Sequence, residues 1–246
     1  MGDALDQRAR LTELLRGTRA VLLDFDGPVT DLFGDASTAP VADEIKDLAR
    51  AIWGALDPDV EACEDSHGIL RRLRDMYDRP APAPRSRTAL DRAEAVVTRF
   101  EYEAVRSARP TQNIGELVDA LVNLKLPLVI VSNNAEGPVW EFLKSVGLQS
   151  KFADVVGRDP HELLHMKPHP SSVNRALRHL RVPPPACLLV GDQITDLQAA
   201  HAAGTRFLGY TPSPARAAEM AARRADGVIS SHQPLIDAAE ALIATN

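Results

Sequence analysis

Three short polar segments of this chain combine carboxylate, hydroxyl and amide side chains, and each directly follows an apolar run. They are Asp24-Phe25-Asp26-Gly27, Ser132-Asn133-Asn134 and Gly191-Asp192-Gln193-Ile194-Thr195-Asp196. Clustered carboxylates without His or Cys favour a hard, oxygen-binding ion such as Mg²⁺. If the ammonium of Lys167 lies beside them, the group also suits a phosphate, and a carboxylate can then attack phosphorus to form an aspartyl-phosphate.

The apolar runs before these segments are typical of strands buried on both faces. Strands are predicted at 20–23, 126–131, 186–190 and 206–210, with weaker candidates at 154–157 and 227–229. From residue 112 onward they alternate with segments of helical periodicity, which predicts βαβ units and a parallel sheet. Ligands of such a sheet bind at the carboxyl ends of its strands. We therefore expect the three polar segments and Lys167 to meet at one site.

The stretch from about residue 32 to residue 110 interrupts this alternation. Apolar positions form three helical stripes, over 41–56, 69–77 and 90–104, and no strand pattern lies among them. The sequence thus predicts an α/β fold: a Rossmann-like parallel sheet core with an inserted all-helical cap. The predicted core comprises residues 1–31 and 113–246, and the predicted cap comprises residues 32–112.

Composition limits the classes of partner. The chain has 246 residues and a formal net charge of −6, whereas a nonspecific nucleic-acid binder is expected to be basic. The longest apolar run, 126–131, is far shorter than the roughly 20 residues that span a bilayer. These features predict a cytoplasmic protein that binds neither nucleic acid nor membrane, as a monomer or homodimer. Abundant Arg and Ala hint at a bacterial source.

The chemical segments together resemble four motifs of the haloacid dehalogenase superfamily, specifically its phosphatase-like members with a helical cap, of the phosphoglycolate phosphatase and β-phosphoglucomutase type. They stand in the order of that family, and the resemblance spans nearly the whole chain. The matching residues are Asp24-x-Asp26-Gly27, Ser132, Lys167 and Gly191-Asp192-x-x-x-Asp196.

The resemblance implies a role for each acidic residue. Asp24 would be the nucleophile that takes the phosphoryl group, and Asp26 the acid for the leaving alcohol and then the base for water. Mg²⁺ would bind Asp24, Asp192 and the backbone carbonyl of Asp26. Asp196 would support the metal through water or hold Lys167.

The resemblance also implies a phosphate site. Gly27, Ser132, Asn133 and Lys167 would contact the phosphoryl oxygens, and Lys167 would also neutralise the nucleophile. Pro28 stands where many of these phosphatases carry Thr, and it removes one backbone N–H from the turn.

Asp26 favours phosphoryl transfer over dehalogenation, because an alkoxide needs a proton to leave and a halide does not. The sequence therefore predicts an enzyme, a Mg²⁺-dependent phosphoric monoester hydrolase that acts on a small phosphorylated metabolite. Two alternatives are a sugar phosphomutase of the same superfamily and a catalytically silent binding or regulatory protein on this fold.

Each motif also has a purely structural interpretation. Asp192 and Asp196 suit the first turn of a helix, and Ser132-Asn133 suits a strand-to-helix turn. In the predicted cap, His67 and the arginines at 71, 72 and 74 are expected to be solvated, or one Arg reaches a second anionic group of the substrate. The histidines at 161, 165 and 169 are not expected to bind metal.

Overall fold

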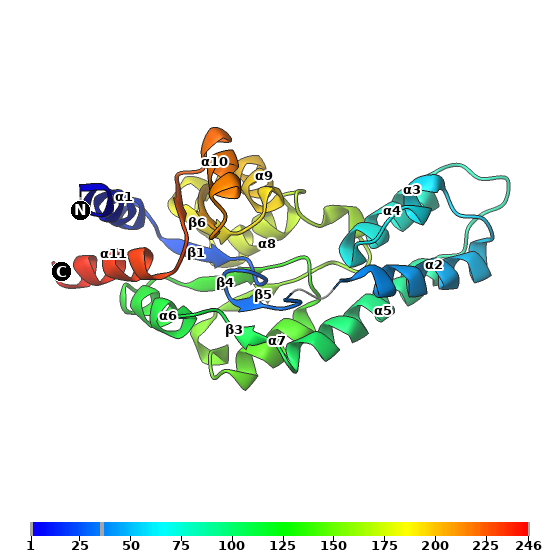
Figure 1. The fold of residues 1–246 in the computed structure, drawn as a ribbon, viewed down its shortest axis with the longest axis horizontal. Helices are drawn as coiled ribbons and strands as arrows, with labels where there is room; N and C mark the ends of the chain where they lie inside the picture. The colour runs from blue at the N-terminus through cyan, green and yellow to red at the C-terminus, as the bar shows by residue number, and fades with distance from the viewer. Residues whose placement is uncertain (1, 35–36, 246) are drawn as a thin grey trace.

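The protein is an α/β structure with a six-stranded parallel sheet between two layers of helices (Figure 1). The computed structural model describes residues 2–34 and 37–245; residues 1, 35, 36 and 246 of the predicted ranges lie outside this part. The strand order is β5-β4-β1-β6-β7-β8. The strands are β1 (Ala20–Leu23), β4 (Leu128–Val131), β5 (Asp154–Val156), β6 (Cys187–Gly191), β7 (Arg206–Tyr210) and β8 (Gly227–Ile229). The predicted fold class and all six predicted strands are confirmed.

The central strand β1 pairs in parallel with β4 on one side and β6 on the other, so that Val21 lies opposite both Leu128 and Leu188. Every residue of β1 is buried, which is why the strand is continuously apolar rather than alternating. These three neighbouring strands are also the ones followed by the three polar segments.

The helices cover both faces of the sheet. Against one face pack α1 (Gly2–Arg16), α6 (Ile114–Asn123), α7 (Glu136–Ser145) and α11 (Gln233–Ile243). Against the other pack α8 (Ser171–Leu180), α9 (Ile194–Ala203) and α10 (Pro214–Ala222). Three short 3₁₀ helices are η1 (Gln149–Lys151), η2 (Leu163–His165) and η3 (Pro184–Ala186). In the described part of the chain, no helix is both long enough and apolar enough to cross a bilayer.

Four helices between β1 and β4 enclose a second, separate cluster of buried residues. They are α2 (Ala39–Trp53), α3 (Pro58–Glu61), α4 (Ser66–Asp78) and α5 (Thr88–Val105). Ile45, Leu70 and Val97 come from three of them and meet inside this cluster. The cluster also contains Leu163 and Met166, from the loop that carries Lys167. The division of the chain at residues 32 and 112 stays a prediction.

The chain crosses between the sheet domain and the helical insertion at two adjacent points. The two-residue strands β2 (Thr30–Asp31) and β3 (Arg109–Pro110) pair antiparallel there. The Thr30 hydroxyl donates to the carbonyl of Arg109 at 2.8 Å. Beside this pair, Phe33 stacks on Phe100 with ring centroids 5.3 Å apart. Because both crossings share one short ladder, the helical insertion enters and leaves the sheet domain at one place.

Replacing Ile45 by Ala should destabilise the helical cluster, because the side chain is fully buried and its removal leaves a cavity. The expected loss is about 2–5 kcal/mol in the free energy of unfolding, measured by urea titration. Ile243→Ala is the control, since Ile243 is 40% exposed at the end of α11 and should lose much less. Equal losses in the two variants would contradict an independent core in the insertion.

Candidate active site

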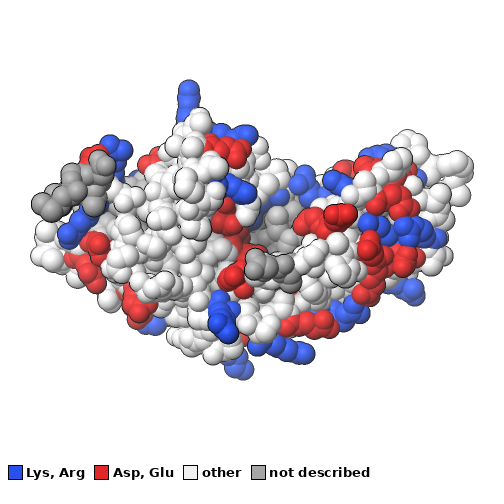
Figure 2. All heavy atoms as spheres, in the orientation of Figure 1, with Lys and Arg blue, Asp and Glu red and all other residues white. Residues whose placement is uncertain are grey.

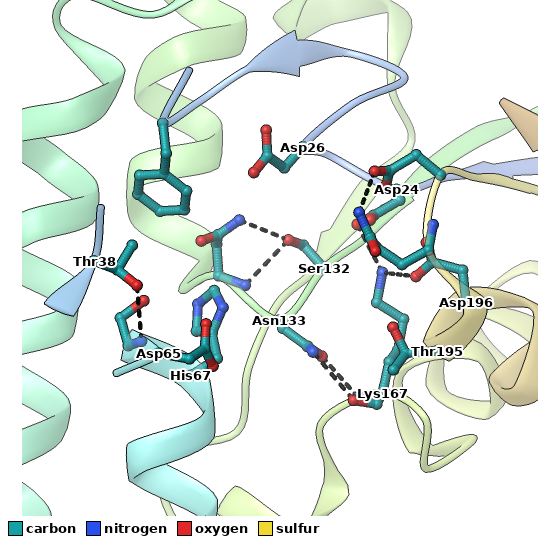
Figure 3. Close-up of a pocket in the computed structure, with 15 residues that line it drawn as sticks. Asp24, Asp26, Thr38, Asp65, His67, Ser132, Asn133, Lys167, Thr195 and Asp196 are labelled. Carbon is teal, nitrogen blue, oxygen red and sulfur yellow. Dashed lines mark hydrogen bonds and ion pairs between the residues drawn. The ribbon is translucent and has the colours of Figure 1, made fainter. Parts of the chain in front are cut away.

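The three polar segments meet at the carboxyl end of the sheet, around a pocket of about 190 Å³ (Figure 3). Because β4, β1 and β6 are neighbours, Ser132, Asp24 and Asp192 follow adjacent strands at the same edge. Lys167 reaches the same place from the loop before α8. The lining residues of the sheet domain are Asp24, Asp26, Ser132, Asn133, Asn134, Lys167, Asp192, Gln193, Thr195 and Asp196.

Lys167 lies between two buried carboxylates. Its Nζ is 2.7 Å from Oδ1 of Asp24 and 2.6 Å from Oδ1 of Asp196, and it donates to the carbonyl of Val131 at 3.1 Å. Burial disfavours the ammonium, but the charges of Asp196 and Asp24 outweigh this and raise the pKa of Lys167. Burial and the nearby charge of Asp196 raise the pKa of Asp24. The ammonium is therefore retained, and its charge is shared by two anions.

The same carboxylates, with Asp192, form a group that can hold a metal ion. Oxygens of Asp24, Asp192 and Asp196 lie within 4.8 Å of one another. Oδ1 of Asp192 is buried and makes no hydrogen bond. Burial and Asp196 raise the pKa of Asp192 to about 7. Carboxyl groups lose their protons when they bind a metal ion, and three carboxylates against one ammonium then leave two negative charges. An all-oxygen site with an unpaired buried oxygen therefore fits a hard divalent cation such as Mg²⁺.

Asp26 lies outside that group. Its carboxyl points away from Asp24 and also lines the pocket (Figure 3). Its Oδ1 accepts the backbone N–H of Leu32 at 2.8 Å, and burial raises its pKa. The next residue, Gly27, has a φ of +96°, and a Cβ there would lie 2.6 Å from Cγ of Asp192. Only glycine lets the turn after Asp26 approach Asp192 this closely.

Ser132 and Asn133 directly follow β4 and line the pocket beside Asn134. The Ser132 hydroxyl accepts from the backbone and side-chain nitrogens of Asn134, each at 3.1 Å. The Asn133 side chain accepts the N–H of Lys167 at 2.7 Å and donates to its carbonyl at 3.2 Å. Asn133 therefore fixes the backbone that carries Lys167, besides lining the pocket.

The turn containing Pro28 is held by a residue that the sequence did not indicate. Nε2 of His232 lies 2.7 Å from the carbonyl oxygen of Pro28, and the ring stacks on Tyr210 with centroids 4.6 Å apart. Burial lowers the pKa of His232, so the neutral ring donates its Nε2 proton to that carbonyl. The Thr111 hydroxyl donates to the carbonyl of Gly27 at 2.8 Å. Two hydrogen bonds from distant residues, His232 and Thr111, thus hold the turn although Pro28 offers no N–H.

The insertion supplies the remaining wall of the pocket. Its lining residues are Phe33, Thr38, Asp65, Ser66 and His67. The arginines at 71, 72 and 74 do not line the pocket. Arg72 donates to the carbonyl of Asp59, and Arg74 pairs with Asp78. The alternative hypothesis that one of them reaches the substrate finds no support in this arrangement.

A parallel α/β sheet with two carboxyls separated by one residue after its central strand, beside an acidic group that could hold a metal ion, is typical of metal-assisted hydrolases. Residues 18–204 match the model of the haloacid dehalogenase-like hydrolases. The chain therefore belongs to the haloacid dehalogenase-like hydrolase family, as the four motifs predicted, and it is an enzyme of that family.

Curated relatives include a phosphoglycolate phosphatase of Thiobacillus denitrificans, 28% identical over 76% of this chain and 80% of the relative. A phosphoglycolate phosphatase of Rhodospirillum rubrum is 35% identical over 40% of this chain and 42% of its own length. Among solved structures, a predicted phosphoglycolate phosphatase from Haemophilus somnus has a TM-score of 0.59 at 20% identity, over 94% of this chain and 99% of that one. The curated relatives confirm the predicted phosphatase class, and the solved structure shows the same fold.

Stability at mildly acid pH should depend on His232. Its pKa is depressed in the folded protein, so the unfolded chain binds its proton first as the pH falls below about 6.5. The wild type should therefore lose stability as the pH falls through this range, and His232→Gln should lose less. Urea unfolding of both proteins at pH 7.5 and 5.5 measures the difference. Parallel losses in the two proteins would rule out a buried neutral His232.

Proposed function

We propose that this enzyme is a Mg²⁺-dependent phosphatase that hydrolyses the phosphate monoester of a small alcohol through an aspartyl-phosphate intermediate on Asp24. One observation carries the proposal: the Asp24 carboxylate lies against the ammonium of Lys167 and the acidic group at the base of the pocket, while Asp26 faces the same cavity. This places a nucleophile, its neutralising charge and a separate proton carrier around one space.

In the first half of the reaction, a carboxylate oxygen of Asp24 forms a bond to phosphorus as the bond to the ester oxygen breaks. Lys167 offsets the negative charge of the nucleophile and of the phosphoryl group, which otherwise repel each other. Ser132 and the backbone N–H of Asn133 contact the phosphoryl oxygens. The predicted contact of Gly27 finds no support here, because its N–H donates to the carbonyl of Thr30 at 2.7 Å. Asp26 gives its proton to the departing oxygen, and its raised pKa supports this role.

In the second half, Asp26 is a carboxylate and takes a proton from water. The water oxygen forms a bond to phosphorus, the bond from phosphorus to Asp24 breaks, and inorganic phosphate leaves. Asp26 is protonated again and Asp24 is ionised again. Both proton transfers use the same carboxyl, so one acid serves both steps.

Mg²⁺ would be held by Asp24, Asp192 and the backbone carbonyl of Asp26. When bound, it supplies positive charge that lets an anionic nucleophile approach an anionic phosphate. Of the two roles for Asp196, the 2.6 Å ion pair supports the one of holding Lys167. The N–H of Gln193 donates to Oδ2 of Asp196 at 3.0 Å and fixes that carboxyl in the first turn of α9. The names of the relatives support a small substrate and make 2-phosphoglycolate one compound to test. The monomeric or homodimeric state stays a prediction.

Asp24→Asn should reduce turnover of p-nitrophenyl phosphate by about 10³-fold or more, because the amide is not a nucleophile. Chelation with EDTA should abolish wild-type turnover, and added Mg²⁺ should restore it. Asp75→Asn is the matched control, since Asp75 is exposed on α4 and does not line the pocket. Unchanged activity of Asp24→Asn, with thermal unfolding like that of the wild type, would refute the proposed mechanism.

Asp26→Asn should separate the two halves of the reaction. With an alkyl phosphate, whose alkoxide needs a proton, the first half should slow by about 10²–10⁴-fold. With p-nitrophenyl phosphate, whose phenolate leaves unprotonated, the first half should stay fast and the second should become limiting. Stopped-flow absorbance should then show one nitrophenolate released per enzyme before slow turnover. Equal slowing on both esters without a burst would show that Asp26 carries no proton.

A further inference from the structure

Among the described residues of the insertion, those that line the pocket include no Lys or Arg. Among the described lining residues of the whole pocket there are five carboxylates and one ammonium. The five are Asp24, Asp26, Asp65, Asp192 and Asp196. The single ammonium, Lys167, already pairs with two of them. The part of the substrate that reaches the insertion therefore meets two hydroxyls, one carboxyl and two rings. They belong to Thr38, Ser66, Asp65, Phe33 and His67.

His67 is held in place by a buried ion pair. Its Nε2 lies 3.0 Å from Oε1 of Glu101, which has no exposed surface. Nη1 of Arg158 donates to the same oxygen at 2.7 Å. His67 lies in the first turn of α4, Glu101 lies on α5, and Arg158 follows β5 in the sheet domain. Burial raises the pKa of Glu101, but the charge of Arg158 outweighs it and the pKa is lowered, so this carboxyl is ionised.

The same pair is bonded to the loop that follows β4. Oε2 of Glu101 accepts the N–H of Ala135 at 2.9 Å. Arg158 donates from Nη1 to the carbonyl of Asn133 at 2.7 Å and from its backbone to the carbonyl of Asn134 at 2.8 Å. The position of His67 is thereby fixed relative to the phosphoryl side of the pocket, not only relative to its own helix.

This bonding determines which ring nitrogen is left for a ligand. An ionised carboxylate only accepts, so the Nε2 of His67 carries the proton. With Nε2 engaged by Glu101, Nδ1 is the ring nitrogen left to contact a hydroxyl of a molecule in the pocket. Figure 3 shows His67 at the insertion side of the cavity, across from the Lys167 and Asp196 pair.

We propose that His67 is the residue of the insertion that recognises the substrate, by accepting a hydroxyl of its alcohol portion, and that Glu101 is the positioning residue that holds the ring. The substrate class is the phosphate monoester of an uncharged alcohol bearing further hydroxyl groups. This inference rests on the proposed function for the phosphoryl end alone.

The charges of the pocket disfavour the alternative, an alcohol that carries a carboxylate. Such a group would lie beside the carboxyl of Asp65, and the described lining residues offer no Lys or Arg besides Lys167 to pair with it. The preferred substrate class therefore differs from 2-phosphoglycolate, after which the curated relatives are named.

Binding and turnover of two esters test the substrate class. Glycerol 3-phosphate carries free hydroxyls and 2-phosphoglycolate carries a carboxylate. With Mg²⁺ present, wild-type kcat/KM should be at least about tenfold higher for glycerol 3-phosphate, and calorimetry on Asp24→Asn should give the same order of Kd. A preference for 2-phosphoglycolate in either measurement overturns the proposal. Since binding to Asp24→Asn requires no turnover, the result stands even if the phosphatase mechanism fails.

His67→Ala should raise KM for glycerol 3-phosphate about tenfold, as expected for one lost hydrogen bond, with a smaller change in kcat. His67→Asn, which keeps a polar atom near the position of Nδ1, should recover part of the loss. A KM within twofold of the wild type in His67→Ala, with unchanged thermal unfolding, overturns the role of His67.

Glu101→Gln should raise KM for the same ester, and adding it to His67→Ala should raise KM no further, because Glu101 acts through the ring. The matched control is Glu94→Gln. Glu94 also pairs with Arg158, at 2.9 Å, but does not contact His67, so this variant should lose stability without a change in KM. Additive effects of Glu101→Gln and His67→Ala overturn the positioning role.

Nitrogen-15 NMR of the His67 ring, recorded without any ligand, is an independent readout. The wild type should show the proton on Nε2, and Glu101→Gln should lose this preference. A proton on Nδ1 in the wild type, or identical spectra in the two proteins, overturns the positioning role. This measurement also covers the case in which Glu101→Gln folds but is too weakly active to assay.

Discussion

The buried ammonium of Lys167, lying between Asp24 and Asp196, is the interaction on which the site depends. Removing one member of a buried ion pair costs about 3–5 kcal/mol, because an uncompensated charge is left behind. The chain therefore has to bring a lysine from the loop before α8 to two carboxyls that are distant in sequence, one after β1 and one in the first turn of α9. Asn133 contributes by bonding the backbone of Lys167 on both sides. The result is an acidic pocket in which one ammonium contacts both buried carboxyls, those of Asp24 and Asp196.

The parts of this site that follow from the sequence are those set by a local pattern. A buried parallel strand is continuously apolar, and the first polar residue after it lies at the carboxyl end of the sheet, which is why Asp24, Ser132 and Asp192 could be placed together. The strand order then made them neighbours. Asp26 and Gly27 follow from the same turn, since the close approach to Asp192 leaves no space for a Cβ.

The parts that the sequence did not indicate depend on pairings between distant residues. His232 lies 204 residues from Pro28, and Glu101 lies 57 residues from Arg158. A lone histidine or a glutamate within an amphipathic helix has no local feature that distinguishes it from a solvated residue. Helix α1 was missed for a related reason: its many charged residues hide the buried positions of Leu11 and Leu15. The two-residue strands β2 and β3 are too short to show any period.

The sheet domain and the insertion contribute different kinds of group to the pocket. The sheet domain concentrates carboxylates around one ammonium, which suits a metal and a phosphoryl group whatever alcohol is attached. The described residues of the insertion that line the pocket include no Lys or Arg, so they discriminate by shape and hydrogen bonding. Specificity of that kind requires that the discriminating group be held rigidly, because a mobile imidazole would accept from water as readily as from a substrate. The Glu101–Arg158 pair meets this requirement: it is buried and joins His67 to the backbone of Asn133 and Ala135. An ion pair that crosses between the two parts thus links recognition of the alcohol to the position of the phosphoryl group.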